Sequence, residues 1–148
     1  MPSEAVENYL TAILRLEEAG EAASTSVLAD RLQVARPSVT GMLKRLGDEG
    51  LVDHEPYRGA RLTARGRRSA RAVIRRHRLV ESFLVGTLGM DPDAVHDEAH
   101  RLEHALSDEV VDRLDAWLGH PEHDPHGQPI PRGPGGRPPA HGRREAGR

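Results

Sequence analysis

The sequence contains no cysteine, few aromatic residues and no long apolar run. Without cysteine the chain forms no disulfide and offers no thiolate ligand to a metal ion. Aromatic residues make up only 3% of the chain, so a core has to be built from aliphatic side chains. The lack of an apolar run of about 18 residues argues against a membrane span. The polar, acidic N-terminus does not resemble a secretion signal, and we expect a cytoplasmic protein without a membrane partner.

Charge is strongly segregated along the chain, although the net charge is only −2. Residues 31–80 hold thirteen Lys or Arg and four Asp or Glu, a net charge of +9. Residues 81–126 hold two Arg and twelve Asp or Glu, a net charge of −10. The basic block suits a polyanion such as DNA, and the acidic block suits a cation. Ordinary solvated helix faces are the alternative explanation.

The first sixty residues follow the pattern of a winged helix-turn-helix. In that pattern the second of two paired helices enters the major groove of DNA, and the hairpin wing lies over the phosphate backbone. Apolar spacing, caps and turn residues predict helices over 4–19, 27–32 (capped by Ser26) and 37–49, and strands over 51–55 and 60–63.

The second paired helix and the wing carry side chains that suit double-stranded DNA. Small apolar groups can touch thymine methyls, hydroxyl groups can bind phosphate, and basic groups supply charge. The DNA-binding residues predicted on this basis are Ala35, Arg36, Pro37, Ser38, Thr40, Lys44 and Arg58.

Three further helices are predicted in the second half. The first is capped by Thr63 and reaches Gly86 or Gly89, with an outer face that includes Arg75, Arg76 and Arg78. The others are predicted over 91–106, opened by Asp91 and Pro92, and over 107–118, opened by Ser107. Trp117, the only tryptophan, lies on an apolar stripe that serves either a subunit interface or the chain's own core. We expect a DNA-binding domain over 1–63, a helical domain over 64–119 and a disordered Pro/Gly/Arg-rich tail over 120–148.

Histidine and glutamate residues at helical spacing predict a metal site in the helical domain. His77 and Glu81 lie four residues apart. His96, His100, Glu103 and His104 project on one face of a helix. Nitrogen and oxygen ligands suit Mn(II), Fe(II), Co(II) or Zn(II), with affinity alone favouring Zn(II). The chain has no H-E-x-x-H motif and no carboxylate clearly placed as a general base, so we do not expect a metallohydrolase or another enzyme.

Several of these motifs resemble the diphtheria toxin repressor family of metal-dependent transcription regulators. They are Tyr9–Ile13, the segment RHRLVE over 76–81, VHDEAHRLEH over 95–104 and DPHGQPIP over 124–131. The resemblance covers residues 4 to 131 approximately. It implies a mainly α fold, with a winged helix-turn-helix followed by a helical metal-binding and dimerisation domain. It also implies a homodimer that binds a palindromic operator and represses metal-uptake genes when metal is plentiful.

The resemblance further implies two metal sites. One uses His77, Glu81 and His96, and the other uses Asn8, His100, Glu103 and His104. This chain departs from the family at two of these positions. Asn8 stands where the iron branch has Met and the manganese branch Asp, and Glu4 or Glu7 are alternatives to it. His100 stands where those branches have Cys and Glu.

The metal implied by the resemblance is Mn²⁺. The histidine motifs resemble the manganese branch, and we expect no SH3-like domain after the Pro-Ile-Pro segment, as in that branch. Fe²⁺, Co²⁺ and Zn²⁺ are the alternative ions, because an added imidazole at His100 favours later metals. A repressor that binds DNA without metal, with the acidic helices serving only dimerisation, is the remaining alternative.

Overall fold

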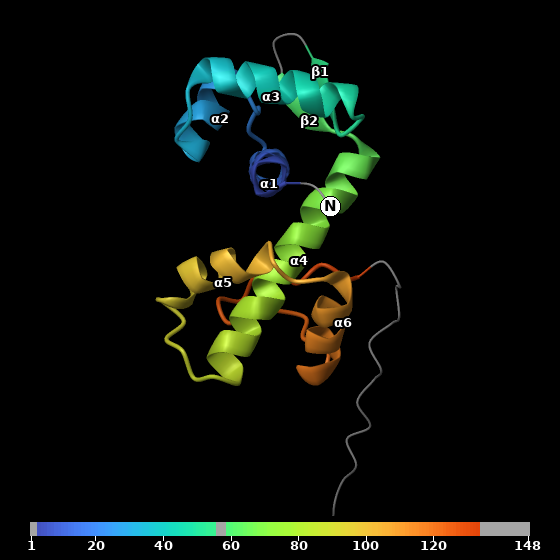
Figure 1. Cartoon of the computed structure of the whole chain (residues 1–148). Helices are drawn as coiled ribbons and strands as arrows, with labels where there is room; N and C mark the ends of the chain where they lie inside the picture. Colours follow the sequence, from blue (N-terminus) through green and yellow to red (C-terminus); the bar gives the residue numbers. More distant parts are fainter. Residues whose placement is uncertain (1–2, 56–58, 134–148) are drawn as a thin grey trace, which may run out of the picture.

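The computed structural model describes residues 3–55 and 59–133, and the prediction of a mainly helical fold is confirmed. No helix within these ranges is long and apolar enough to cross a membrane. The elements in order are α1 (Glu4–Glu18), α2 (Thr25–Leu32), α3 (Arg36–Asp48), β1 (Val52–Glu55), β2 (Gly59–Leu62), α4 (Ala64–Gly86), α5 (Val95–Glu103) and α6 (Asp108–Trp117) (Figure 1).

Local sequence signals explain where most helices begin. Thr63 caps α4 by accepting a hydrogen bond from the amide of Gly66, and Ser107 caps α6 in the same way, as predicted. Two starting points differ from the prediction. Ser24 rather than Ser26 caps α2. The helix α5 begins at Val95 rather than at 91–92, because Asp91 closes a separate turn by accepting from the amide of Asp93.

The strands β1 and β2 form the wing. They pair antiparallel, with Val52 opposite Leu62 and Glu55 opposite Gly59. The turn between them, at 56–58, lies outside the described residues. A hydrogen bond from the amide of Leu62 to the carboxylate of Glu17 ties the wing to α1.

The helix α4 contributes to two hydrophobic cores. In Figure 1 it runs from the group formed by α1, α2, α3 and the wing to the group formed by α5 and α6. Its first half places Ala70 and Ile74 in the core built by α1, α2, α3 and the wing. Its second half places Val80 and Leu84 against α5. The residues of α4 between these two stretches therefore lie at the junction of the two cores.

Two arginines of α4 do not lie on an outer face as predicted. Arg75 and Arg76 are 8% and 7% exposed. Arg75 binds Asp112 and Asp115 of α6 at 3.1 and 3.2 Å, and Arg76 binds Asp108 at 2.6 Å. The prediction was wrong because the basic and acidic blocks pair with each other across the α4–α6 contact. Burial of a guanidinium is tolerated where carboxylates compensate its charge.

The prediction of disorder from residue 120 is wrong for residues 120–133. This segment folds against α4, where the side chain of Arg78 donates to the carbonyl of Pro129. Buried Asp124 organises a turn by accepting from the amides of His126 and Gln128 at 2.9 and 2.8 Å. Side-chain and backbone hydrogen bonds thus order a segment in which Ile130 is the only aliphatic residue apart from proline. Residues 134–148 lie outside the described residues.

Candidate metal centre and nucleic-acid interface

The helix α3 presents the predicted DNA-binding residues on one exposed face. Its apolar residues Val39, Leu43 and Leu46 are buried in the first core. The remaining face carries exposed side chains that the structure places together, namely Ala35, Arg36, Pro37, Ser38, Thr40 and Lys44. Arg58, the seventh predicted residue, lies outside the described residues. These apolar, hydroxyl and cationic groups are of the kinds that contact base edges and phosphates in a duplex.

The candidate metal centre is built around two buried carboxylates, Glu81 of α4 and Glu103 of α5. They are 2% and 4% exposed. Within the described ranges each forms ion pairs with three imidazoles, and His77 lies between the two carboxylates. Buried carboxylates surrounded by histidine are costly unless a cation or protons compensate them.

Glu81 uses its two oxygens toward different partners. Its Oε1 contacts Nε2 of His77 and lies 3.8 Å from Nδ1 of His96. Its Oε2 lies 2.8 Å from Nδ1 of His126, and Asp124 belongs to the same group of ligand-type residues. A hydrogen bond from Nε2 of His126 to the carbonyl of Pro92 raises the pKa of His126, and the charges of Glu81 and Asp124 add to the rise. That hydrogen bond leaves Nδ1 as the nitrogen directed at Glu81.

Glu103 binds two imidazoles, and in each ring the nitrogen that faces its carboxylate is Nδ1. Its Oε2 is 2.5 Å from Nδ1 of His77, and its Oε1 is 3.0 Å from Nδ1 of His100. A neutral imidazole that donates through Nδ1 keeps a free electron pair on Nε2. The carboxylate therefore directs Nε2 of His77 toward Glu81 and Nε2 of His100 toward α1.

Glu7 of α1 holds His104 in a similar way. Its Oε2 lies 2.5 Å from Nδ1 of His104, and its Oε1 lies 3.6 Å from the guanidinium of Arg76. Glu7 is 4% exposed, so this is a buried contact between the DNA-binding and helical domains. A carboxylate that binds one ring nitrogen fixes the ring orientation and makes the other nitrogen a better metal ligand.

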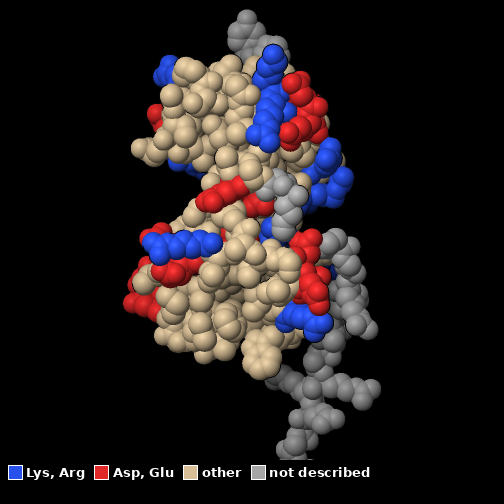
Figure 2. Space-filling model, in the orientation of Figure 1, with Lys and Arg blue, Asp and Glu red and all other residues tan. Residues whose placement is uncertain are grey.

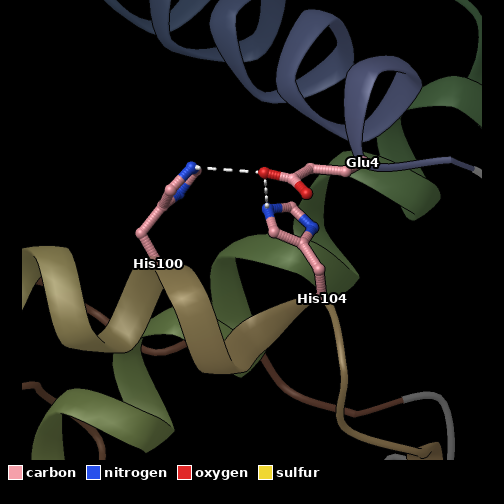
Figure 3. Close-up of side chains that lie close together, drawn as sticks. All are labelled: Glu4, His100 and His104. Carbon is pink, nitrogen blue, oxygen red and sulfur yellow. Dashed lines mark ion pairs between the residues drawn. The ribbon is translucent and has the colours of Figure 1, made fainter.

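The imidazoles of His100 and His104 meet the carboxylate of Glu4, as Figure 3 shows. Nε2 of His100 is 3.8 Å from Oε1 of Glu4, and Nε2 of His104 is 3.9 Å from the same oxygen. Glu4 comes from the first turn of α1, whereas the two histidines come from the end of α5. Acidic side chains at the waist between the two lobes are visible in Figure 2.

A cavity of about 280 Å³ lies beside these groups. Its lining includes Asn8, His77, His96, His100 and Glu103. The structure therefore brings Asn8 to the same region as the predicted ligands. The side chain of Asn8 makes no hydrogen bond with those ligands in the described part of the chain.

Two independent features of the side chains in this centre suit a divalent cation. Among the described residues, Oε2 of Glu81 and Nε2 of His104 are buried metal-ligand atoms without a hydrogen bond, although Oε2 of Glu81 is paired with Nδ1 of His126 at 2.8 Å. In addition, both nitrogens of His77 face carboxylates, whereas a neutral imidazole can donate to only one of them. A cation at the Nε2 side satisfies the second carboxylate. The donors are all nitrogen and oxygen, which suits Mn(II), Fe(II), Co(II) or Zn(II).

All the histidines and glutamates predicted as ligands lie in this region. His126 and Asp124 belong to the segment that was predicted to be a disordered tail, and neither was predicted as a ligand, but both lie beside Glu81. The signal was present, because both belong to the DPHGQPIP segment that carries part of the resemblance. Glu7, considered only as a substitute ligand, instead contacts Nδ1 of His104.

Fold and centre together define a winged-helix DNA-binding protein whose second domain gathers divalent-metal ligands. Two family models match the chain. The N-terminal DNA-binding domain of the iron-dependent repressors matches residues 1–60, and their metal-binding and dimerisation domain matches residues 63–132. The chain belongs to the iron-dependent repressor family, also called the diphtheria toxin repressor family, whose members are transcriptional repressors and not enzymes.

Similar proteins agree with this assignment. The diphtheria toxin repressor of Corynebacterium glutamicum is 42% identical over 125 residues, which are 84% of this chain and 55% of that protein. A helix-turn-helix transcriptional regulator of Methanocaldococcus jannaschii is 38% identical over 117 residues, which are 78% of this chain and 94% of the regulator. A solved manganese-dependent transcriptional repressor in complex with manganese matches with a TM-score of 0.81 and 46% identity, covering 89% of this chain and 60% of that one. The chain thus spans little more than half the length of the repressors from Corynebacterium.

Proposed function

We propose that this protein is a metal-dependent transcriptional repressor that binds operator DNA as a homodimer when a divalent metal ion is bound. The observation that carries the proposal is the pair of buried carboxylates, Glu81 and Glu103, each in contact with three imidazoles. Glu7 and Glu4 of α1 reach the same centre. Metal binding thereby acts on the domain that carries α3.

We propose two metal positions in each chain. One uses His77, Glu81 and His96, with Asp124 and His126 on the other carboxylate oxygen of Glu81. The other uses His100, Glu103 and His104, with Asn8 in the wall of the adjacent cavity. When bound, the ion supplies positive charge that joins side chains from α1, α4 and α5. Glu103 orients the imidazoles of His77 and His100, and Glu7 orients that of His104.

We propose Mn²⁺ as the regulatory ion and metal-uptake genes as the targets. The likeness to the manganese-dependent repressor structure supports this choice. Fe²⁺, Co²⁺ and Zn²⁺ are the competing ions, since the ligand set is compatible with each of them. By linkage, the factor by which metal raises operator affinity equals the factor by which operator raises metal affinity.

The decisive experiment measures DNA affinity as a function of metal. Duplexes that bind the protein are first selected from a random-sequence pool in the presence of Mn²⁺. The selected sequences are expected to be palindromic because the proposed dimer has two-fold symmetry. Affinity for the selected duplex is then measured by fluorescence anisotropy with Mn²⁺, Fe²⁺, Co²⁺ and Zn²⁺ separately. We expect at least about a 30-fold gain with Mn²⁺, within the usual range of allosteric coupling. Equal affinity with metal and with chelator supports the metal-independent repressor instead.

Lys44 provides a test of the DNA-binding face. Its side chain is exposed on α3 and forms no ion pair within the described ranges, so we expect it to bind a phosphate. Lys44→Ala should lower operator affinity about tenfold and reduce the slope of log K against log salt by about 1. Arg113→Ala, on exposed α6, is the matched control and should leave both quantities unchanged. An unaltered salt slope for Lys44→Ala contradicts the assigned face.

A further inference from the structure

We propose that Glu4, in the first turn of α1, is the carboxylate ligand that this chain contributes from its DNA-binding domain to the ion held by His100 and His104. The inference rests on the proposed function. Asn8, the residue of α1 that the resemblance assigns to this site, is neutral, and its amide makes no hydrogen bond with either imidazole among the described residues. Glu4 therefore supplies the negative charge that a neutral amide lacks.

The geometry points to one position bounded by three atoms. Nε2 of His100 and Nε2 of His104 lie 3.8 and 3.9 Å from the same oxygen of Glu4 (Figure 3). These separations are too long for hydrogen bonds. They are about half an ångström longer than the roughly 3.4 Å between two tetrahedral ligand atoms that each bind one transition ion at about 2.1 Å, a gap that the exposed side chain of Glu4 can close. The fold brings the three side chains together from distant parts of the sequence, since ninety-six positions separate Glu4 from His100.

Both imidazoles are already prepared to present Nε2. Nδ1 of His100 is held by Glu103 at 3.0 Å, and Nδ1 of His104 is held by Glu7 at 2.5 Å. Nε2 of His104 is buried and has no hydrogen-bond partner in the described part of the chain. A buried nitrogen without a hydrogen bond is costly unless a ligand satisfies it. A cation between Nε2 and Glu4 provides that ligand.

Glu4 differs from the other acidic groups of the centre in exposure. Its side chain is 61% exposed, whereas those of Glu7 and Glu103 are each 5% exposed. An exposed side chain loses conformational freedom when it binds an ion. The binding of metal therefore fixes the side chain of Glu4 against the end of α5, where Glu7 and Glu103 are already buried.

Calorimetry on the full-length chain tests the proposal, with Mn²⁺ and Co²⁺ as the probes. Wild type is expected to bind two ions. Glu4→Gln, which keeps the shape and removes the charge, should weaken one of the two sites at least tenfold and leave the other unchanged. It should also change the visible absorption of bound Co²⁺. Glu18→Gln, an exposed change at the other end of α1, is the matched control and should behave as wild type.

The outcomes separate this inference from the proposed function. A wild-type chain that binds no metal overturns the proposed function itself. Two intact sites and an unchanged Co²⁺ spectrum in Glu4→Gln overturn the role of Glu4 alone. If Asn8→Ala loses more metal affinity than Glu4→Gln does, the ligand from α1 is Asn8, and this result also overturns the role of Glu4. Far-UV circular dichroism confirms that each variant is folded.

Discussion

Replacing His104 by alanine is expected to abolish metal-dependent operator binding while leaving a folded dimer. The side chain presents Nε2 to the proposed ion and receives Glu7 at Nδ1, so its loss removes a ligand and the contact with α1 together. Loss of groups that merely orient a ligand typically costs 10–100-fold in metal affinity or activity. We therefore expect operator affinity in Mn²⁺ to fall to the value measured with chelator, a loss of at least about 30-fold. Anisotropy with the selected duplex measures the effect, and sedimentation measures the dimer.

His123→Ala is the matched control for this experiment. His123 is exposed, lies in the segment after α6 and belongs to none of the ligand groups among the described residues. Its variant should bind operator as wild type does. Folding of His104→Ala is expected to survive because Arg76 still compensates the buried charge of Glu7. Full metal-dependent binding by His104→Ala contradicts the assignment of the site.

Replacing Gly66 by alanine is expected to destabilise the fold strongly. A Cβ at this position would lie 2.0 Å from the carbonyl oxygen of Leu51. That oxygen also accepts from the amide of Thr63, whose hydroxyl caps α4 through the amide of Gly66. The first turn of α4 must therefore move away from the wing and break both hydrogen bonds. Overpacking and two lost bonds together cost about 3 kcal/mol.

Urea unfolding in the presence of a chelator measures this effect, since bound metal would add its own stabilisation. The melting temperature should fall by roughly 10 °C. Gly86→Ala is the control, because a Cβ there meets nothing within 4 Å at the end of the same helix. Its stability should stay within about 1 kcal/mol of wild type, in the direction set by helix propensity. Equal stabilities of the two variants would show that α4 does not approach Leu51 so closely.

Local patterns were enough to predict most of the fold, since caps and apolar spacing depend on neighbours in the sequence. Thr63 and Ser107 mark helix starts correctly for this reason. The failures concern long-range partners. The burial of Arg75 depends on Asp112 and Asp115, which lie about forty positions away. The order in residues 120–133 depends on contacts with α4, such as that of Arg78 with Pro129, which no local pattern encodes.

The residues of the metal centre could be predicted only in part from the sequence. Candidate ligands spaced four residues apart on one helix, such as His77 and Glu81, can be recognised from their spacing in the sequence. Residues from separate elements do not, and only the fold brings Glu4 to His104 or His126 to Glu81. Which ring nitrogen faces which carboxylate also follows from tertiary packing alone. The roles of Glu7 and Glu103 in holding imidazoles were therefore accessible only from the structure.

The position of His77 between Glu81 and Glu103 has a consequence for the order in which ions are loaded. A neutral ring carries one proton, and an ion on Nε2 confines that proton to Nδ1, facing Glu103. Glu103 then accepts from His77 through Oε2, and its Oε1 is directed at His100. The first ion at the Glu81 end thus stabilises the arrangement of Glu103 that already orients His100 at the other end. Occupancy would then rise more steeply with metal concentration than for two independent sites, which gives the repressor a sharper threshold.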